Sequence, residues 1–434
     1  MGNLKNFQLI MVVLFTFGGI LGVFVFAGFI DLGSKGVNTG PRGTVTIWGT
    51  YPKSIIDPLI NENNQTADFT MRYVAKDPNT FESELLEAFA IDKGPDLFFL
   101  PDNLLIKYQD KISVVPYTTY PLIKFKNTFV EAGESFLNSR GIIALPVNID
   151  PLMMYFNKTL LDSNNIIYPP SYWEEFPDLV KIFTKKNSEG QILKSAFALG
   201  QAGNVNNAKE ILLARFMQYG NNITYLNKSN YRSSIKQDLE VSPDLINALE
   251  FYMSFSDPLN ANYSWNRSLP NSQDAFSQED LVFYFGFASE LGKLFQKNPN
   301  HNFGVYPIPQ NKDKEQKATL GRLNGIAISL FTKDFATSYA AMNTIADSKF
   351  AEKLSKSLAI PPARRDLLAK RDNNEYGPVF YSSALFAKPF IDPSKKDTDI
   401  LFRGVIESIL SNGSSPKNAI DNFHNRLNLL LLNQ

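Results

Sequence analysis

The chain has 434 residues and carries 43 basic and 43 acidic side chains, so its formal net charge is zero and it lacks the basic excess of a nucleic-acid-binding protein. It has no cysteine and two histidines, which excludes disulfides, thiolate nucleophiles and cysteine metal sites. We therefore expect no nucleic-acid partner and no histidine-rich catalytic metal site, which leaves a metal site made of oxygen ligands alone as the open alternative. No metal site and no cofactor are assigned. The length exceeds what one hydrophobic core usually holds, and two lobes or domains are expected.

The N-terminal segment Phe7–Ile30 is apolar except for Gln8 and Thr16. At about 1.5 Å per residue it is longer than the roughly 30 Å hydrocarbon core of a bilayer. A cleaved secretory signal has a shorter apolar core and a small-x-small cleavage site, and we find no convincing site of this kind. The pattern favours an uncleaved single-pass anchor at 7–30, with residues 1–6 on the cytoplasmic side and 31–42 as a flexible tether. A cleaved signal is the alternative.

Beyond the tether, short runs rich in β-branched and aromatic residues alternate with helical patterns. Strands are predicted at Gly43–Trp48, Phe69–Val74 and Leu97–Leu100, and helices at Ile55–Asn61 and Phe81–Ile91. This alternation indicates an open, mostly parallel α/β sheet, in which ligands lie beyond the carboxyl ends of the strands. Trp48 and Tyr51 end the first strand, and Asp102 and Asn103 follow the third, so these four side chains are expected at one edge.

Two apolar runs, Gly141–Leu145 and Leu152–Phe156, are separated by Pro146, Asn148, Asp150 and Pro151. An apolar run of this length is typical of a buried strand. Polar side chains have no place in the middle of one, because burying them unpaired costs a few kcal/mol. We interpret the stretch as a crossover between two lobes, with Asn148 and Asp150 facing a cleft.

The later part of the chain repeats the alternation of helix and strand patterns. Helices are predicted from Ser171, over Ala208–Tyr219, Pro243–Phe255 and Asp274–Glu279, and over Lys333–Ser357, Asp399–Leu410 and Ser415–Leu432, and strands at Leu281–Ala288, Phe303–Pro309 and Thr319–Leu330. No internal repeat or low-complexity segment interrupts this order.

Several motifs stand in the order seen in one family of binding proteins. They are VTIWGTYP, GPDLFFLPDN, GIIALPVNIDPLMMYFNK followed by PPSYWEEF, AFSQEDLVFYFGFASEL, VYPIPQ, LGRLNGIAIS, LAIPPARRDLL and SSPKNAIDNF. In this ordered combination the chain resembles the extracellular solute-binding proteins, family 1, of ABC transporters, the class that includes maltodextrin and other sugar binders.

The resemblance implies a two-lobed periplasmic-binding-protein-like fold of type II with three crossings between α/β lobes. Carried over segment by segment, the crossings fall near Val147–Ile149, Phe283–Phe287 and Asn324–Ala327. The first lobe would then hold residues 43–148 and 287–325, and the second lobe residues 149–286 and 326–434.

The resemblance also implies that aromatic faces stack on sugar rings while polar side chains bond the hydroxyls. The expected ligand contacts are Trp48, Tyr51, Asp102, Asn103, Asn148, Asp150, Tyr155, Trp265, Phe287, Arg322 and Phe386. Some of these residues can instead have a structural role. Trp48 can cap the core, Asp102 and Asp150 can cap a helix or a turn, Trp265 can plug a loop, and Arg322 can pair across the lobes. The pattern departs from the family at Gly321–Gly325, where paired glycines are common, and at Phe287, where a tryptophan is often found.

The function that the resemblance implies is a membrane-tethered, extracytoplasmic protein of a bacterial cell that binds a carbohydrate and delivers it to an ABC permease. It would not be an enzyme. A tethered sensor that presents the solute to a signalling partner is one alternative. The other is a glycoside hydrolase that uses Asp102 and Asp150 as its carboxylate pair.

Overall fold

The computed structural model describes residue 11 and residues 41–227, 230–237, 240–370 and 374–432. Residues Gly43–Gln434 form one compact unit of their own. The predicted anchor at 7–30 lies outside the described residues except for Met11. Among the described helices, none is both long and apolar enough to cross a bilayer.

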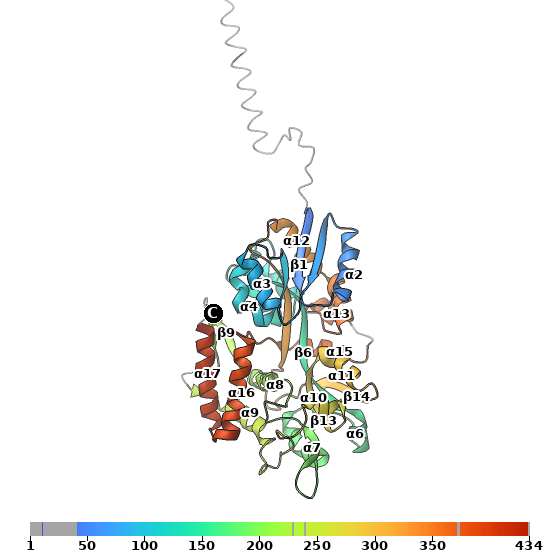
Figure 1. The fold of residues 1–434 in the computed structure, drawn as a ribbon, viewed down its shortest axis with the longest axis vertical. Helices are drawn as coiled ribbons and strands as arrows, with labels where there is room; N and C mark the ends of the chain where they lie inside the picture. The colour runs from blue at the N-terminus through green and yellow to red at the C-terminus, as the bar shows by residue number, and fades with distance from the viewer. Residues whose placement is uncertain (1–10, 12–40, 228–229, 238–239, 371–373, 433–434) are drawn as a thin grey trace, which may run out of the picture. The chain divides into compact units, whose positions relative to one another are not determined.

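The first lobe is built on a sheet that contains the three strands predicted at the start of the soluble part (Figure 1). Parallel strands β2, β1 and β3 lie next to each other, and β15 pairs antiparallel with β3. Alternate residues of β1, such as Val45 and Ile47, are buried against the helices of one face. The strands are β1 (Gly43–Gly49), β2 (Phe69–Ala75), β3 (Leu97–Pro101), β4 (Leu137–Asn138) and β5 (Gly141–Ile142). The helices are α2 (Lys53–Asn64), α3 (Phe81–Ala90), α4 (Leu105–Tyr108), α5 (Leu122–Thr128), α12 (Phe335–Ile345), α13 (Ser348–Leu358) and α14 (Arg365–Leu368), with 3-10 turns η1 (Asp102–Leu104), η2 (Gln109–Lys111) and η3 (Glu131–Phe136).

The second lobe surrounds strand β13, which is fully buried and pairs with β6 on one edge and β8 on the other. Its core is dense in aromatic rings: Phe176 stacks on Phe197 with centroids 3.7 Å apart. The strands are β7 (Lys185–Lys186), β8 (Ile192–Phe197), β9 (Thr224–Asn227), β10 (Asn230–Ser233), β11 (Lys236–Gln237), β12 (Glu240–Val241), β13 (Leu281–Phe287), β14 (Phe303–Pro307) and β16 (Ala387–Lys388). The helices are α6 (Lys158–Ser163), α7 (Phe176–Phe183), α8 (Ala208–Gln218), α9 (Pro243–Ser254), α10 (Ser272–Ser277), α11 (Leu291–Lys297), α15 (Gly377–Ala384), α16 (Lys395–Asn412) and α17 (Pro416–Leu432), with η4 (Trp173–Glu175) and η5 (Ala288–Glu290).

Two long strands, β6 (Leu145–Asn157) and β15 (Thr319–Ile328), belong to both lobes. They pair with each other at the middle of the molecule, from Gly321 opposite Pro151 to Ile326 opposite Leu145. The first half of β6 joins the sheet of the first lobe, and its second half pairs with β13 and β14. The polar interruption in the sequence is therefore the place where one continuous strand leaves one lobe for the other.

The crossing expected at Phe283–Phe287 is wrong. This segment is β13, and its register with Leu152–Phe156 keeps it inside the second lobe. Strand β14 follows it and pairs with the far end of β6, so the chain from residue 287 to β15 stays in the second lobe as well. β15 then runs from the second lobe into the first, the reverse of the direction expected at Asn324–Ala327.

The boundaries expected for the end of the chain also change. Helices α12 and α13 pack on β1, β15 and α2, which places them in the first lobe and not in the second. Residues 360–363 then run beside β6, where Ile149 N–H donates to the Pro361 carbonyl at 3.0 Å and Ala363 N–H donates to the Val147 carbonyl at 3.0 Å. The chain reaches the second lobe at α15, which packs on β6 and β14.

Candidate functional site

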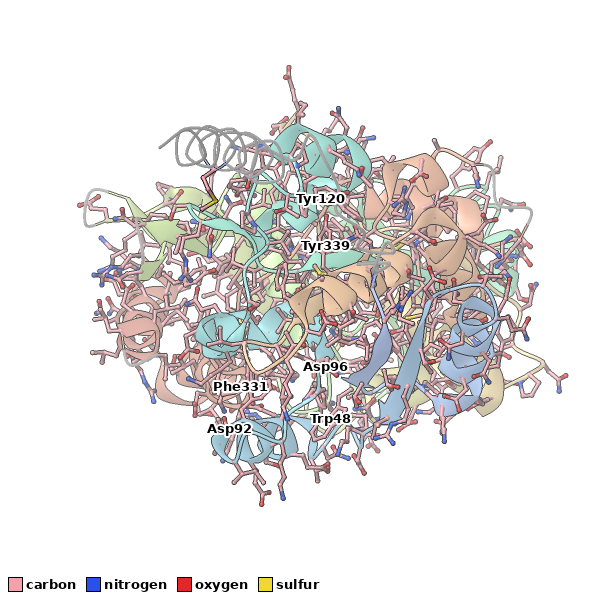
Figure 2. All side chains as sticks on the ribbon, turned by 90° about the horizontal axis from the view of Figure 1, so that it is seen from above. Trp48, Asp92, Asp96, Tyr120, Phe331 and Tyr339 are labelled. Atoms are coloured by element: carbon pink, nitrogen blue, oxygen red, sulfur yellow. The ribbon has the colours of Figure 1, made fainter. Side chains whose placement is uncertain are left out.

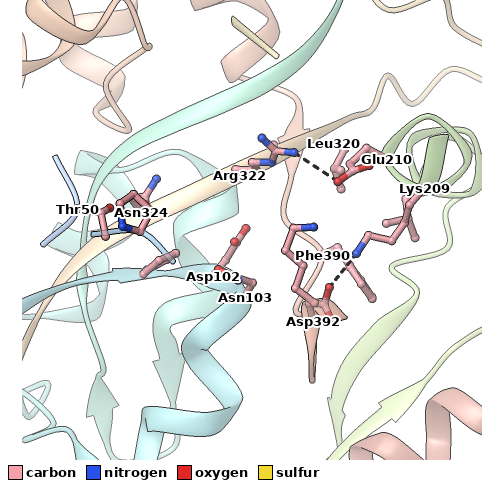
Figure 3. Close-up of a pocket in the computed structure, with 15 residues that line it drawn as sticks. Thr50, Asp102, Asn103, Lys209, Glu210, Leu320, Arg322, Asn324, Phe390 and Asp392 are labelled. Carbon is pink, nitrogen blue, oxygen red and sulfur yellow. Dashed lines mark hydrogen bonds and ion pairs between the residues drawn. The ribbon is translucent and has the colours of Figure 1, made fainter. Parts of the chain in front are cut away.

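A cavity of about 430 Å³ lies between the two lobes (Figure 3). The first lobe supplies the loops after β1 and β3, the second lobe supplies the start of α8 and the chain before α16, and β15 crosses the cavity between them. The lining residues are Thr50, Pro78, Pro101, Asp102, Asn103, Lys209, Glu210, Leu213, Leu320, Gly321, Arg322, Asn324, Phe390, Asp392 and Lys395. Acidic and basic side chains are equally represented, so the cavity suits a polar solute of many hydrogen-bonding groups.

Asp102 forms the wall of the first lobe. It follows Pro101, the last residue of β3, begins the 3-10 turn η1 and is buried. Its Oδ2 accepts a hydrogen bond of 3.0 Å from the Leu323 N–H on β15, and no ion pair holds it among the described residues. Burial raises the pKa of Asp102 to about 7, although the N–H groups of Leu323 and Asn103 and the charge of Arg322 act in the opposite direction. The carboxyl is thus anchored on one side and faces the cavity with the other.

Lys209 and Glu210 form the opposite wall, in the first turn of α8. Every residue of the helix other than Glu210 is buried, Lys209 included, and Glu210 is partly exposed at the cavity. The Lys209 ammonium is buried between Asp392, at 3.2 Å, and Asp399. Burial by itself lowers the pKa of Lys209, but these carboxylates outweigh it and raise the pKa above its ordinary value. Lys209 therefore ties α8 to the chain before α16.

Arg322 lies at the centre of the site, on the strand shared by both lobes. Its guanidinium is 3.5 Å from the centre of the Phe287 ring. Its Nη2 is 3.4 Å from Glu210 Oε1 (Figure 3). The side chain is 43% exposed. A guanidinium held flat on an aromatic ring keeps its remaining N–H donors in a fixed direction. Arg322 can therefore present those donors to a solute.

Polar contacts join the shared strands below the cavity. Asn148 Nδ2 donates to the Tyr51 hydroxyl at 2.8 Å, and Asn148 Oδ1 accepts from Asn324 Nδ2 at 3.2 Å. Asp150 Oδ1 accepts a 3.0 Å hydrogen bond from the Ser289 N–H of the second lobe. Burial raises the pKa of Asp150 to about 6 and also raises that of Tyr51. Asn148 and Asp150 hold the crossing strands and do not line the cavity in this conformation.

Of the eleven expected ligand contacts, three line the cavity, namely Asp102, Asn103 and Arg322, and the other eight do not. Trp48 lies beside the sheet of the first lobe on the side of α3, with the Lys76 ammonium 3.7 Å from the centre of its ring (Figure 2). Tyr155 and Trp265 are fully buried in the core of the second lobe, and the Tyr155 hydroxyl donates to the Phe287 carbonyl at 2.8 Å. Phe386 lines none of the cavities described, and its carbonyl accepts from the Thr319 N–H. The structure corrects Tyr155 and Trp265 to core positions.

Several residues that line the interlobe cavity were not predicted from the sequence. Lys209 and Glu210 stand at the start of a mostly apolar helix, and a charged pair at that point is a signal that the sequence carries. Asp392 precedes Ser394, the N-cap of α16, and is easily read as part of a helix start. The aromatic residue at the cavity in this part of the chain is Phe390, four positions beyond the expected Phe386.

Among the described residues, no group of three or more His, Asp or Glu side chains is placed to hold a metal ion.

Neither a family model nor a curated protein matches the sequence. Similar solved structures exist at 15–20% sequence identity. The cyclic alpha-maltosyl-1,6-maltose binding protein from Arthrobacter globiformis superposes with a TM-score of 0.73 at 17% identity, covering 90% of this chain and 99% of that one. The sugar-binding protein MalE from Xanthomonas citri gives 0.72 at 16% identity, covering 90% and 98%. An ABC substrate-binding protein from Listeria monocytogenes, in complex with cycloalternan, gives 0.65 at 17% identity, covering 89% and 98%.

These likenesses show the fold. The two-lobed α/β architecture expected from the sequence is confirmed, and it is the architecture of sugar-binding proteins of ABC transporters.

Proposed function

We propose that the protein is a membrane-tethered, extracytoplasmic substrate-binding protein of an ABC importer that binds a carbohydrate between its lobes. The observation that supports this most is the cavity itself. Both lobes and the strand β15 contribute polar side chains to one cavity, so a solute there bonds all three at once. Ligand sites of this kind lie at the junction of domains.

A carbohydrate fits the chemistry of the lining. Asp102 and Glu210 offer acceptors, and Arg322, Lys395 and Asn103 offer donors, which together match hydroxyl groups that both donate and accept. The similar structures carry names that point to the same class, among them complexes with maltotetraose and mannotriose. The ring-stacking surface is smaller than expected from the sequence, because Phe390 is the aromatic residue that lines the cavity.

The proposed mechanism is closure of the lobes about the segments that connect them. These are β6, β15 and the chain from residue 359 to 376, of which residues 371–373 lie outside the described structure. A ligand shifts such an equilibrium only through contacts that are better made in the closed state. Asp102 lies on one wall and Glu210 on the other, so a sugar bonded to both provides that difference.

Hydrolysis is the weaker alternative. The carboxylate pair considered from the sequence is Asp102 and Asp150, but Asp150 does not line the cavity and its Oδ1 accepts the Ser289 N–H. The carboxylates that do line the second-lobe wall, Glu210 and Asp392, are each in an ion pair. This arrangement favours binding over turnover.

The direct test is calorimetry of residues 43–434 with a panel of neutral oligosaccharides. We expect one of them to bind with a stoichiometry of one, and Glu210→Ala to weaken it. Ser382→Ala, on the exposed side of α15, is the control. Binding of peptides or polyamines in place of every sugar would refute the carbohydrate assignment.

The tether is tested separately, by extracting membranes from cells that express the chain. The full-length protein should stay in the membrane after alkaline carbonate treatment, and a secreted fragment that begins at Gly43 should not. Release of both would contradict the anchor.

A further inference from the structure

Two more cavities lie along helix α16 beyond the interlobe cavity. The middle cavity, about 250 Å³, shares Lys209, Glu210, Arg322 and Lys395 with the interlobe cavity. The distal cavity, about 550 Å³, lies in the second lobe beside the end of the same helix. From here on, these three cavities are called the α16 groove.

One face of α16 lines all three cavities. Its lining residues are Lys395 in the interlobe cavity, Asp399, Phe402, Arg403 and Ile406 in the middle one, and Ile409 and Leu410 in the distal one. Their spacing of three or four places them in one stripe along the helix, because an α-helix has 3.6 residues per turn. From Lys395 to Leu410 the stripe is about 22 Å long at 1.5 Å per residue. The cavities are therefore in line with each other and parallel to the helix.

A second segment follows the same path. Ala202 and Val205 line the middle cavity, and Gln201 lines the distal one. Both the helix and this loop thus carry the lining from one cavity into the next.

Gln201 points to a ligand at the distal end. Its side chain is only 5% exposed, and its amide makes no hydrogen bond to any residue that the structure describes. Its backbone is held, because the Tyr252 hydroxyl donates to the Gln201 carbonyl at 2.8 Å. The amide atoms of Gln201 are not among the fully buried groups that lack a partner, so they open to the distal cavity that this residue lines. The amide oxygen and NH₂ of Gln201 match two neighbouring sugar hydroxyls, one as donor and one as acceptor.

The rest of the distal cavity suits the same kind of ligand. Met253, Ile409 and Leu410 give an apolar surface for the C–H face of a sugar, and Tyr263 and Arg267 add polar groups. Arg267 is 3.5 Å from Glu407 in a largely exposed ion pair, which contributes little and can rearrange.

Resting on the proposed function, we propose that the solute is a linear oligosaccharide whose chain leaves the interlobe cavity and lies along the α16 groove as far as Gln201. Arg403 is the donor in the middle of the path. It is exposed, lines the middle cavity and has no partner among the described residues.

The test is calorimetry of the full-length chain with linear gluco- and manno-oligosaccharides from disaccharide to heptasaccharide. Affinity should rise with length, with a gain of about tenfold for the members that reach Gln201, the size that one good hydrogen bond supplies. Gln201→Leu should abolish this gain and leave the shortest binding member unchanged. Arg403→Ala, on the surface, should reduce the affinity of the long and intermediate members. Gln296→Leu and Arg426→Ala, at exposed positions that line none of the cavities described above, are the matched controls.

The outcomes separate the two proposals. Equal affinity for all lengths, or an equal effect of the groove variants on short and long sugars, would overturn the groove and leave the interlobe site intact. If no oligosaccharide of any length binds, the proposed function fails and the groove with it.

Discussion

Replacing Asp102 by Asn should stabilise the protein, and the gain should grow with pH. Asp102 is a buried carboxyl without an ion pair among the described residues, and burial raises its pKa from 3.8 to about 7. The unfolded chain loses this proton near pH 4 and the folded chain near pH 7. The wild-type protein therefore keeps its full stability below about pH 4 and loses part of it as pH rises to 7. At about 1.4 kcal/mol per pKa unit, the loss above pH 7 is on the order of 4 kcal/mol.

An Asn at this position removes the charge and keeps an oxygen that accepts the Leu323 N–H. Urea unfolding of residues 43–434 at several pH values between 4 and 8 measures the effect. The free-energy difference between Asp102→Asn and wild type should increase steadily from pH 4 to 7 and level off above it. Asp313→Asn, at an exposed position, is the control and should show no such increase. A difference that stays flat or falls with pH would refute the reasoning that Asp102 is buried without compensation.

The remaining predictions concern the basic residues of the second lobe and of β15. Arg322→Lys should lower sugar affinity by about tenfold in calorimetry and change stability little, because an ammonium cannot lie flat on Phe287; an unchanged affinity would contradict it. Lys209→Met should lower the unfolding free energy at pH 7 by about 3 kcal/mol in urea, because the buried Asp392 loses its cation. No loss would show that the pair is not buried in solution. Arg215→Met should leave the urea midpoint unchanged or raise it, because Nε and Nη1 of this buried arginine have no partner and burial lowers its pKa to about 10; a large drop would mean that its contact with the Trp173 ring dominates.

The secondary structure of the soluble part follows closely from the sequence, because each segment has one clear period. The runs at Gly43–Trp48 and Phe69–Val74 are strands that the structure extends by one residue, and the helical pattern at Ala208–Tyr219 is α8. Lys333–Ser357 is two helices, since Asp347 caps a new one by accepting the Phe350 N–H.

The sequence did not predict correctly which segments of the chain cross between the lobes. β13 and the second half of β6 are both short apolar runs, and both are almost entirely buried. The two strands differ in their pairing. β6 pairs with strands of both lobes along its length, whereas β13 pairs on both edges with strands of the second lobe. Pairing depends on residues far away in the chain, and hydrophobic periodicity does not encode it.

The candidate site could also be predicted only in part from the sequence, because it too depends on residues far apart in the chain. Asp102, Asn103 and Arg322 line the cavity because they stand at the ends or in the middle of strands that the pattern does show. The second-lobe wall is assembled from Lys209 and Asp392, which are 183 positions apart. Tyr155 illustrates the reverse case, since an aromatic residue beside a crossing is as suitable for the core as for a ligand.

The central claim is that a carbohydrate binds between the lobes and brings them together. The chain has no cysteine, so spin labels at Glu87→Cys in the first lobe and Lys396→Cys in the second are unique. The distance between the labels, measured by pulsed electron resonance, should shorten and narrow in distribution when an oligosaccharide that binds in calorimetry is added. An oligosaccharide that binds in calorimetry but leaves the distance between the labels unchanged would contradict closure. If no sugar binds and none changes the distance, the proposed function itself is contradicted.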